Sequence, residues 1–193
     1  MPRPVLDVLA GGDDAGKRSI GGYLLQREGL TSFNPDTLAR ELNAATGCGQ
    51  ESANAYAWHE SLWRQDQAVM NVANFAFETT LGVRTVATRI LAATRTHAVH
   101  VWFCGLATPE RHIARVRARV ADRGHDIPDA KIRERYSCAQ GNLIRLMPPA
   151  GCSHPTGVLF ASALRIEREQ RAIGFAREGT RLRQQLGSRK TVF

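Results

Sequence analysis

Short apolar runs alternate along this chain with longer segments in which apolar and polar positions repeat at helical spacing. Apolar runs predict buried strands at 4–10, 74–80 and 98–106, and a shorter extended piece at 32–36. Helical periodicity, with Pro and Gly at the segment ends, predicts helices at 17–28, 35–45, 51–73, 84–96, 109–123 and 129–147. This alternation is typical of an α/β fold, so we expect a parallel sheet of about five strands with helices on both faces.

The segment 51–73 carries large apolar side chains at seven-residue steps. Tyr56, Trp63 and Met70 follow one another at this spacing. Because such a stripe on a helix is usually turned toward the protein interior, we expect these three residues to belong to the core.

The composition fits one ordinary domain with an uneven charge. The chain has 193 residues, 43% hydrophobic and 23% charged, which excludes a disordered, collagen-like or coiled-coil protein. Residues 111–193 hold 17 basic and 7 acidic side chains, a net charge of +10, whereas residues 1–110 carry −2, which together give the formal net charge of +8. Such a basic half is typical of proteins that bind nucleic acid, a membrane surface or a phosphate-rich small molecule. Few aromatic residues are interleaved with its arginines, so nucleic acid is the less favoured of these partners.

The cysteines and the apolar runs place further limits on function. The four cysteines lie far apart without a CxxC or Cys/His cluster, so we expect reduced thiols in the cytoplasm rather than a zinc site. No apolar stretch approaches 18 residues and the N-terminus lacks a signal-peptide pattern, so we expect no membrane partner.

The most specific local pattern, GGDDAGKR, follows the first predicted strand. Gly11, Gly16 and Lys17 match the constrained positions of GxxxxGK[ST], a loop whose backbone N–H groups and lysine bind phosphates. Arg18 stands where the motif has a hydroxyl for Mg²⁺, and Ser19, which follows, is the candidate metal ligand. We expect the nucleotide-binding residues to be Gly11, Gly12, Asp13, Asp14, Ala15, Gly16, Lys17, Arg18 and Ser19.

Several longer blocks resemble one family. GGDDAGKRSIGG, LTSFNPDTLARELNAATG, NFAFETTLG and VWFCGLATPERHIARVRARVADRGHDIPDAKIRERY, followed by NLIRLMP, resemble the zeta-toxin-like P-loop kinases over residues 4–148. The resemblance implies a P-loop kinase fold, with ATP and Mg²⁺ as cofactors. It also implies transfer of phosphate to a small-molecule hydroxyl, such as one of UDP-N-acetylglucosamine, and an antitoxin protein as a candidate partner.

The resemblance, read together with phosphoryl-transfer chemistry, assigns a role to several residues outside the phosphate loop. Asp36 matches the proposed general base, and the position also suits the first turn of a helix. Glu78 is a candidate for the Mg²⁺ shell or for substrate contact, with a helix cap as the alternative. We expect Thr79, Thr80 and His125 to contribute to substrate binding.

Arginines of the predicted helix at 109–123 share one face. Arg111, Arg115 and Arg119 are spaced four residues apart. The resemblance implies that Arg119, together with Arg135 or Arg133, stabilises charge on the transferred phosphoryl group.

The resemblance ends near residue 148. We therefore expect a kinase domain at 1–148 and an atypical basic C-terminal extension at 149–193, in which VLFASAL could add a strand or start a helix. The altered loop leaves two alternatives to a working phosphotransferase: a degenerate nucleotide-binding protein without catalysis, and an arginine-rich nucleic-acid-binding protein.

Overall fold

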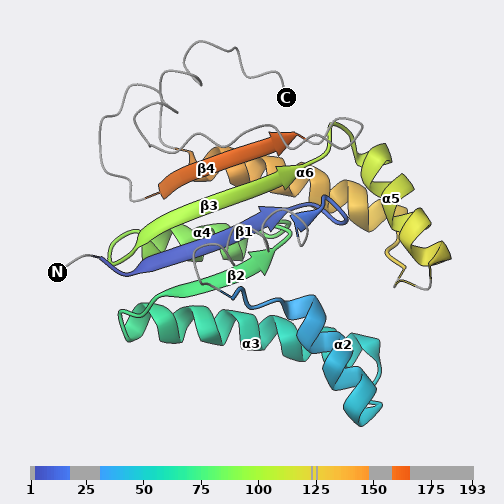
Figure 1. Cartoon of the computed structure of the whole chain (residues 1–193), viewed down its shortest axis with the longest axis horizontal. Helices are drawn as coiled ribbons and strands as arrows, with labels where there is room; N and C mark the ends of the chain where they lie inside the picture. The colour runs from blue at the N-terminus through green and yellow to red at the C-terminus, as the bar shows by residue number, and fades with distance from the viewer. Residues whose placement is uncertain (1–2, 18–30, 123, 125, 148–157, 166–193) are drawn as a thin grey trace.

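Four parallel strands form the sheet in the part of the chain that the structure describes. The computed structural model describes residues 3–17, 31–122, 124, 126–147 and, as backbone only, 158–165. The strands stand in the order β2–β1–β3–β4 (Figure 1). Their bounds are β1 Val5–Gly11, β2 Phe75–Thr79, β3 Ala98–Gly105 and β4 Val158–Arg165.

The expectation of about five strands is wrong by one within the described part of the chain. The extended piece predicted at 32–36 makes a single parallel bridge, Phe33 with Phe77, beside β2. Asn34 already caps the next helix and Pro35 is its first residue, so the extended backbone ends before a ladder can form.

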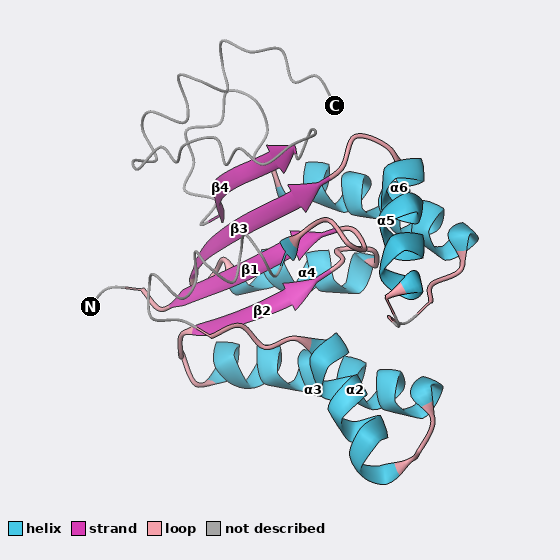
Figure 2. Cartoon of the chain, turned by 45° about the vertical axis from the view of Figure 1, so that its right-hand side comes forward, coloured by secondary structure: helices cyan, strands magenta, loops and turns pink. Residues whose placement is uncertain are grey.

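The five described helices agree with the predicted segments to within about three residues at either end. The helix predicted at 17–28 lies almost wholly outside the described residues. Figure 2 shows α2 and α3 together below the β2 edge, with α5 beyond the carboxyl ends of the strands. The bounds are α2 Pro35–Thr46, α3 Gln50–Met70, α4 Arg84–Ala93, α5 Pro109–Ala121 and α6 Asp129–Leu146.

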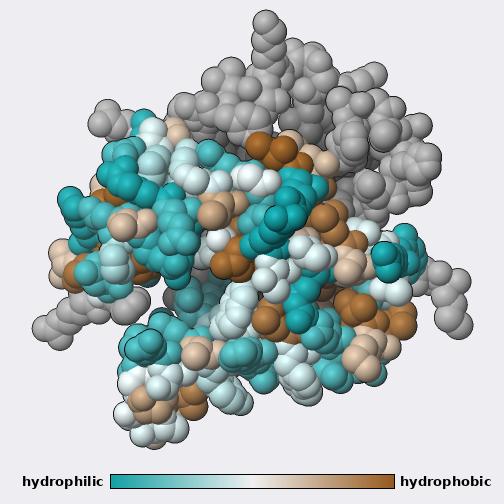
Figure 3. Space-filling model, turned by 180° about the vertical axis from the view of Figure 1, so that it is seen from behind, coloured by the Kyte–Doolittle hydropathy of each residue, from teal (hydrophilic) through white to brown (hydrophobic). Residues whose placement is uncertain are grey.

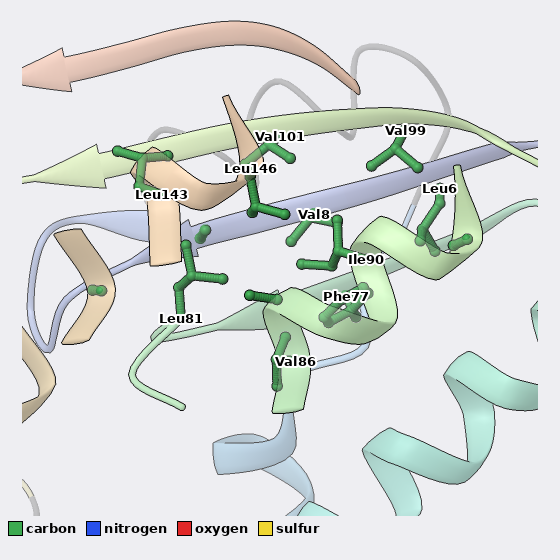
Figure 4. Close-up of a cluster of buried hydrophobic side chains, with 14 residues drawn as sticks. Leu6, Val8, Phe77, Leu81, Val86, Ile90, Val99, Val101, Leu143 and Leu146 are labelled. Carbon is green, nitrogen blue, oxygen red and sulfur yellow. The ribbon is translucent and has the colours of Figure 1, made fainter. Parts of the chain in front are cut away.

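The main core lies between one face of the sheet and helices α4 and α6 (Figure 4). Alternate residues of β1, such as Leu6 and Val8, face Ile90 of α4 and Leu146 of α6, and all four are at most 2% exposed. The alternation follows from the period of a strand, which sends every second side chain to the same face. Helices on the opposite face, which the sequence also predicts, are not among the described residues.

The prediction that Tyr56, Trp63 and Met70 belong to the core is wrong. These side chains are 54%, 56% and 74% exposed. Helix α3 instead buries its small residues, with Ala53 and Ala57 packed against α2. Small side chains allow two helices to approach closely, so the heptad stripe of large residues is left on the outside.

Strand β4 lies within the predicted extension 149–193 and pairs in parallel with β3, with a register shift between Val101 and Trp102. It therefore completes an edge of the sheet, and the division of the chain at residue 148 stays a prediction. No helix in the described part of the chain is long and apolar enough to cross a membrane.

Candidate functional site

The loops that follow β1, β2 and β3 meet at the carboxyl edge of the sheet. Ala10 of β1 pairs with Thr79, and Gly11 pairs with Cys104 of β3, so the three strands end side by side. A cleft of about 1140 Å³ opens there between the α2–α3 side and the α5–α6 side. From behind, the molecule is hollowed between the lobe formed by α2 and the body above it (Figure 3). Ligands of parallel α/β sheets bind at this edge.

The loop after β1 lies in the cleft with the backbone that its glycines allow. Gly11 has φ 148°, and a Cβ on it would lie 2.1 Å from the carbonyl oxygen of Cys104. Only glycine fits where two backbones approach so closely. Asp14, with φ 50°, adopts a left-handed conformation that Asp tolerates better than most residues.

Lys17 folds back over this loop. Its Nζ donates to the carbonyl oxygens of Gly11 at 2.7 Å and Gly12 at 2.9 Å. These bonds use two of the three donors of the ammonium group and hold its charge above the loop. The charge of Lys17 therefore lies beside the loop in the cleft, and the phosphate-binding role of the residue stays a prediction.

His112 of α5 supports this loop, a contact that no pattern in the sequence indicates. The residue is 1% exposed, and its Nδ1 lies 2.5 Å from the carbonyl oxygen of Asp13, a bond that Nδ1 donates in the neutral ring. Its ring lies so close to Gly12 that a Cβ there would be 2.6 Å from Cε1. Burial lowers the pKa of His112, which favours this neutral donor. Only the tertiary contact between α5 and the loop identifies the residue.

The two acidic residues of the loop pair with arginines of α5 and α6. Asp13 is 8% exposed and its Oδ1 lies 3.0 Å from Nη1 of Arg135. Oδ2 of Asp14 lies 3.1 Å from Nε of Arg119, and Arg115 donates to the backbone oxygen of Asp14 at 3.2 Å. The structure thus brings Arg119 and Arg135, the two arginines predicted to bind the phosphoryl group, to the loop after β1.

The remaining arginines separate by location. Of the two alternatives on α6, Arg135 lines the cleft, whereas Arg133 pairs with the exposed Glu110 outside it and lowers the pKa of that carboxyl. Arg117 pairs with Asp129 on the surface at 2.6 Å. The helix face predicted from spacing therefore contributes Arg115 and Arg119 to the cleft.

The end of β2 supplies a buried carboxylate. Glu78 is 8% exposed, lines the cleft and accepts a hydrogen bond of 3.3 Å from the hydroxyl of Ser32. Thr79 and Thr80 also line the cleft, and their hydroxyls accept from the next turn of backbone, from Leu81 N at 3.0 Å and Gly82 N at 3.3 Å. These two hydroxyls shape the turn and keep a donor for a ligand.

Asp36 enters the cleft from the first turn of α2. Asn34 caps this helix by accepting from Thr37 N at 3.1 Å, and Pro35 fixes its first residue. Asp36 lines the same cleft as Lys17 and Glu78. Its helix position follows the sequence prediction.

The α3 wall of the cleft is polar and was not foreseen. Its lining residues are Gln50, Asn54, Trp58, Ser61 and Gln65. The amide nitrogen of Gln65 donates a hydrogen bond of 3.2 Å to the hydroxyl oxygen of Ser61. Ser61 and Gln65 are buried, one helical turn apart, and this spacing of polar residues among small ones was the available signal.

Three predicted site residues, Arg18, Ser19 and His125, lie outside the described residues. Within the described part of the chain, no group of three His, Cys, Asp or Glu side chains is arranged to hold a metal ion. Proteins usually bind Mg²⁺ through one or two carboxylates together with substrate phosphates. The buried carboxylate of Glu78 fits that requirement.

No protein-family model and no curated protein matches the chain. Solved structures do. A candidate kinase from Chloroflexus aurantiacus J-10-fl is 15% identical with a TM-score of 0.55, covering 67% of this chain and 74% of its own. The Pnkp1/Rnl/Hen1 RNA repair complex gives 16% identity and a TM-score of 0.57 over 75% of this chain, which spans about half (47%) of the matched chain.

A gluconokinase from Sinorhizobium meliloti 1021 matches at 14% identity, covering 82% of each chain, but its TM-score of 0.43 is too low to carry an argument. At these identities the first two likenesses show the fold alone. The chain therefore shares the fold of these two structures.

Proposed function

We propose that this protein is an ATP-dependent small-molecule kinase of the zeta-toxin type, transferring the γ-phosphate of ATP to a hydroxyl of a nucleotide sugar such as UDP-N-acetylglucosamine. One observation carries the proposal. A lysine on the phosphate loop, a carboxylate on α2 and arginines on α5 and α6 line a single cleft at the carboxyl edge of the sheet: Lys17, Asp36, Arg119 and Arg135.

Each of these groups suits one part of phosphoryl transfer. Asp36 would accept the proton of the acceptor hydroxyl as its oxygen bonds to the γ-phosphorus, while the bond to the bridging oxygen breaks and ADP leaves. Lys17 would bind phosphate oxygens beside the loop. Arg119 and Arg135 would stabilise the charge spread over the transferred group.

Mg²⁺ would neutralise charge on the phosphates when bound. Glu78 is the described residue suited to hold it, directly or through a water molecule, with Ser19 as the hydroxyl ligand that the sequence predicts.

The α3 wall supports an acceptor rich in hydroxyl groups. Amides and hydroxyls from Gln50, Asn54 and Ser61 both donate and accept hydrogen bonds, which suits uncharged hydroxyls. Trp58 adds an apolar surface beside them.

Ion pairing supports a small ligand over nucleic acid. Arg117, Arg119, Arg133 and Arg135 of α5 and α6 each pair with a carboxylate. This pairing leaves less unneutralised charge for a phosphate backbone. An antitoxin partner remains part of the proposal through the zeta-toxin resemblance.

The second candidate function is nucleotide binding without catalysis. It is favoured by the two carboxylates of the phosphate loop, Asp13 and Asp14, which already pair with the arginines that transfer would need.

Calorimetry with ATP and Mg²⁺, followed by transfer of labelled γ-phosphate to UDP-N-acetylglucosamine, separates the two functions. The kinase predicts both binding and transfer, and Lys17→Ala should abolish them. Binding without transfer to any of a panel of sugars and nucleotide sugars would favour the non-catalytic function. No binding of ATP at any Mg²⁺ concentration would refute both.

A further inference from the structure

The phosphate loop carries its own anions, and they are tied to the arginines that face it. Asp13 Oδ1 lies 3.0 Å from Arg135, and Asp14 Oδ2 lies 3.1 Å from Arg119. The side chain of Asp13 is 7% exposed, and its Oδ2 is buried without a hydrogen-bond partner among the described residues. Burying a carboxylate oxygen without a hydrogen-bond donor destabilises the folded protein. Folding stability therefore does not explain why an aspartate stands at position 13.

The charges that line the cleft also cancel. Among the described lining residues six are basic and six are acidic: Lys17, Arg40, Arg115, Arg119, Lys131 and Arg135 against Asp13, Asp14, Asp36, Glu78, Asp122 and Asp126. A cleft built only to attract a polyphosphate would carry an excess of positive charge.

We infer that Asp13 and Asp14 act as internal anions that hold Arg135 and Arg119 at the phosphate loop, and that a bound polyphosphate displaces the arginines from them. The inference rests on the proposed function. A guanidinium binds carboxylate and phosphate oxygens with the same planar set of donors, so the two anions compete for it. Affinity for a polyphosphate is therefore set by the difference between the new contacts and the ion pairs that are lost.

Competition can be told apart from simple repulsion by its dependence on the arginine. If the arginine leaves the aspartate when phosphate binds, neutralising Asp13 helps most while Arg135 is present. If Arg135 stays on Asp13 and shields it, neutralising Asp13 helps little until Arg135 is removed. The sign of the coupling between the two residues therefore decides the question.

A double-mutant cycle read by calorimetry with inorganic triphosphate tests this competition. Asp13→Asn keeps the side-chain shape, and we expect it to raise the affinity at least tenfold in the wild-type background. In Arg135→Gln the same change should raise the affinity by a clearly smaller factor, because it then removes only the repulsion between Asp13 and the phosphate and no ion pair has to be broken. A second cycle with Asp14→Asn and Arg119→Gln should behave alike, since Asn also tolerates the left-handed backbone of Asp14.

Asp122→Asn is the matched control, because Asp122 lines the same cleft and makes no ion pair with the described residues. It should change the affinity less than threefold, and melting curves should show every variant folded. An equal or larger gain in the arginine-free backgrounds, or weaker binding by both Asp→Asn variants, would overturn the inference. Triphosphate binding that shows the coupling without phosphate transfer would refute the kinase and leave the inference standing. Absence of triphosphate binding in every variant would refute both.

Discussion

The buried histidine under the phosphate loop offers the sharpest test of how this fold builds its site. His112→Phe keeps an aromatic ring against Gly12 and Tyr136 but removes the donor that lies 2.5 Å from the carbonyl oxygen of Asp13. A buried acceptor left without its donor costs about 1–3 kcal/mol. We expect a loss of this size in the free energy of unfolding, measured by urea denaturation.

His112→Phe should also weaken the binding of triphosphate. If the loop escapes the cost by shifting the carbonyl of Asp13 toward water, ligand binding must restore the original backbone. At 1.4 kcal/mol per factor of ten, triphosphate affinity would fall by roughly 5- to 150-fold. His112→Asn is the matched control because its amide also offers an N–H donor, and it should lose less affinity than His112→Phe.

The histidine also gives the stability a pH dependence of known sign. Burial lowers the pKa of His112 in the folded protein, whereas in the unfolded chain its pKa returns to about 6.5. Below that pH the unfolded chain binds a proton that the folded chain does not, so the free energy of unfolding falls as the pH drops below about 6.5. Removing His112 should make this fall shallower. The reasoning would be refuted if His112→Phe had the same free energy of unfolding, the same triphosphate affinity and the same pH dependence of stability as the wild-type protein.

Three further predictions concern individual side chains. Asp36→Asn should leave ATP affinity within a few-fold and lower phosphate transfer at least ~10²-fold, the usual worth of a positioned base; unchanged turnover would remove Asp36 from the mechanism. Arg135→Ala should lower the maximal rate more than ATP affinity, because its contact strengthens with the developing charge, whereas Arg133→Ala on the outer side of α6 should leave the rate unchanged. Burial raises the pKa of Cys104 to about 11, so at pH 8 the folded protein should be alkylated at the exposed Cys48 and not at Cys104; mass spectrometry of the labelled peptides reads this, and rapid labelling of Cys104 would contradict it.

The sequence predicted the parts of the fold that depend on local pattern. β1 and β3 are mostly apolar segments rich in β-branched residues, and Pro35 and Pro109 mark the first turns of α2 and α5. The glycine turn after β1 was predictable for the same reason, because Gly11 adopts φ 148°, a backbone conformation that favours glycine.

Features that depend on which elements pack together were not predictable. The stripe of Tyr56, Trp63 and Met70 has the spacing of a buried face, yet α3 buries its small residues because α2 lies close to them. His112 carries no spacing signal, since its partner is a backbone oxygen 99 positions away in the chain.

In the sequence, the acidic residues of the loop and the arginines of α5 and α6 are unrelated features. In the structure they pair with each other, Asp13 with Arg135 and Asp14 with Arg119. An unpaired carboxylate about 4 Å from a phosphate would oppose phosphate binding by ~4 kcal/mol at an effective dielectric of 20. In the sequence alone, Asp13 and Asp14 therefore suggest a loop that has lost the ability to bind a polyphosphate. Their pairing with Arg135 and Arg119 changes that reading, because the loop and the arginines neutralise each other before any ligand arrives. Under the proposed function, activity then depends on whether a nucleotide can displace the arginines from the aspartates. Substitution of Asp14 alone would break its ion pair with Arg119 but leave the pair between Asp13 and Arg135 in place.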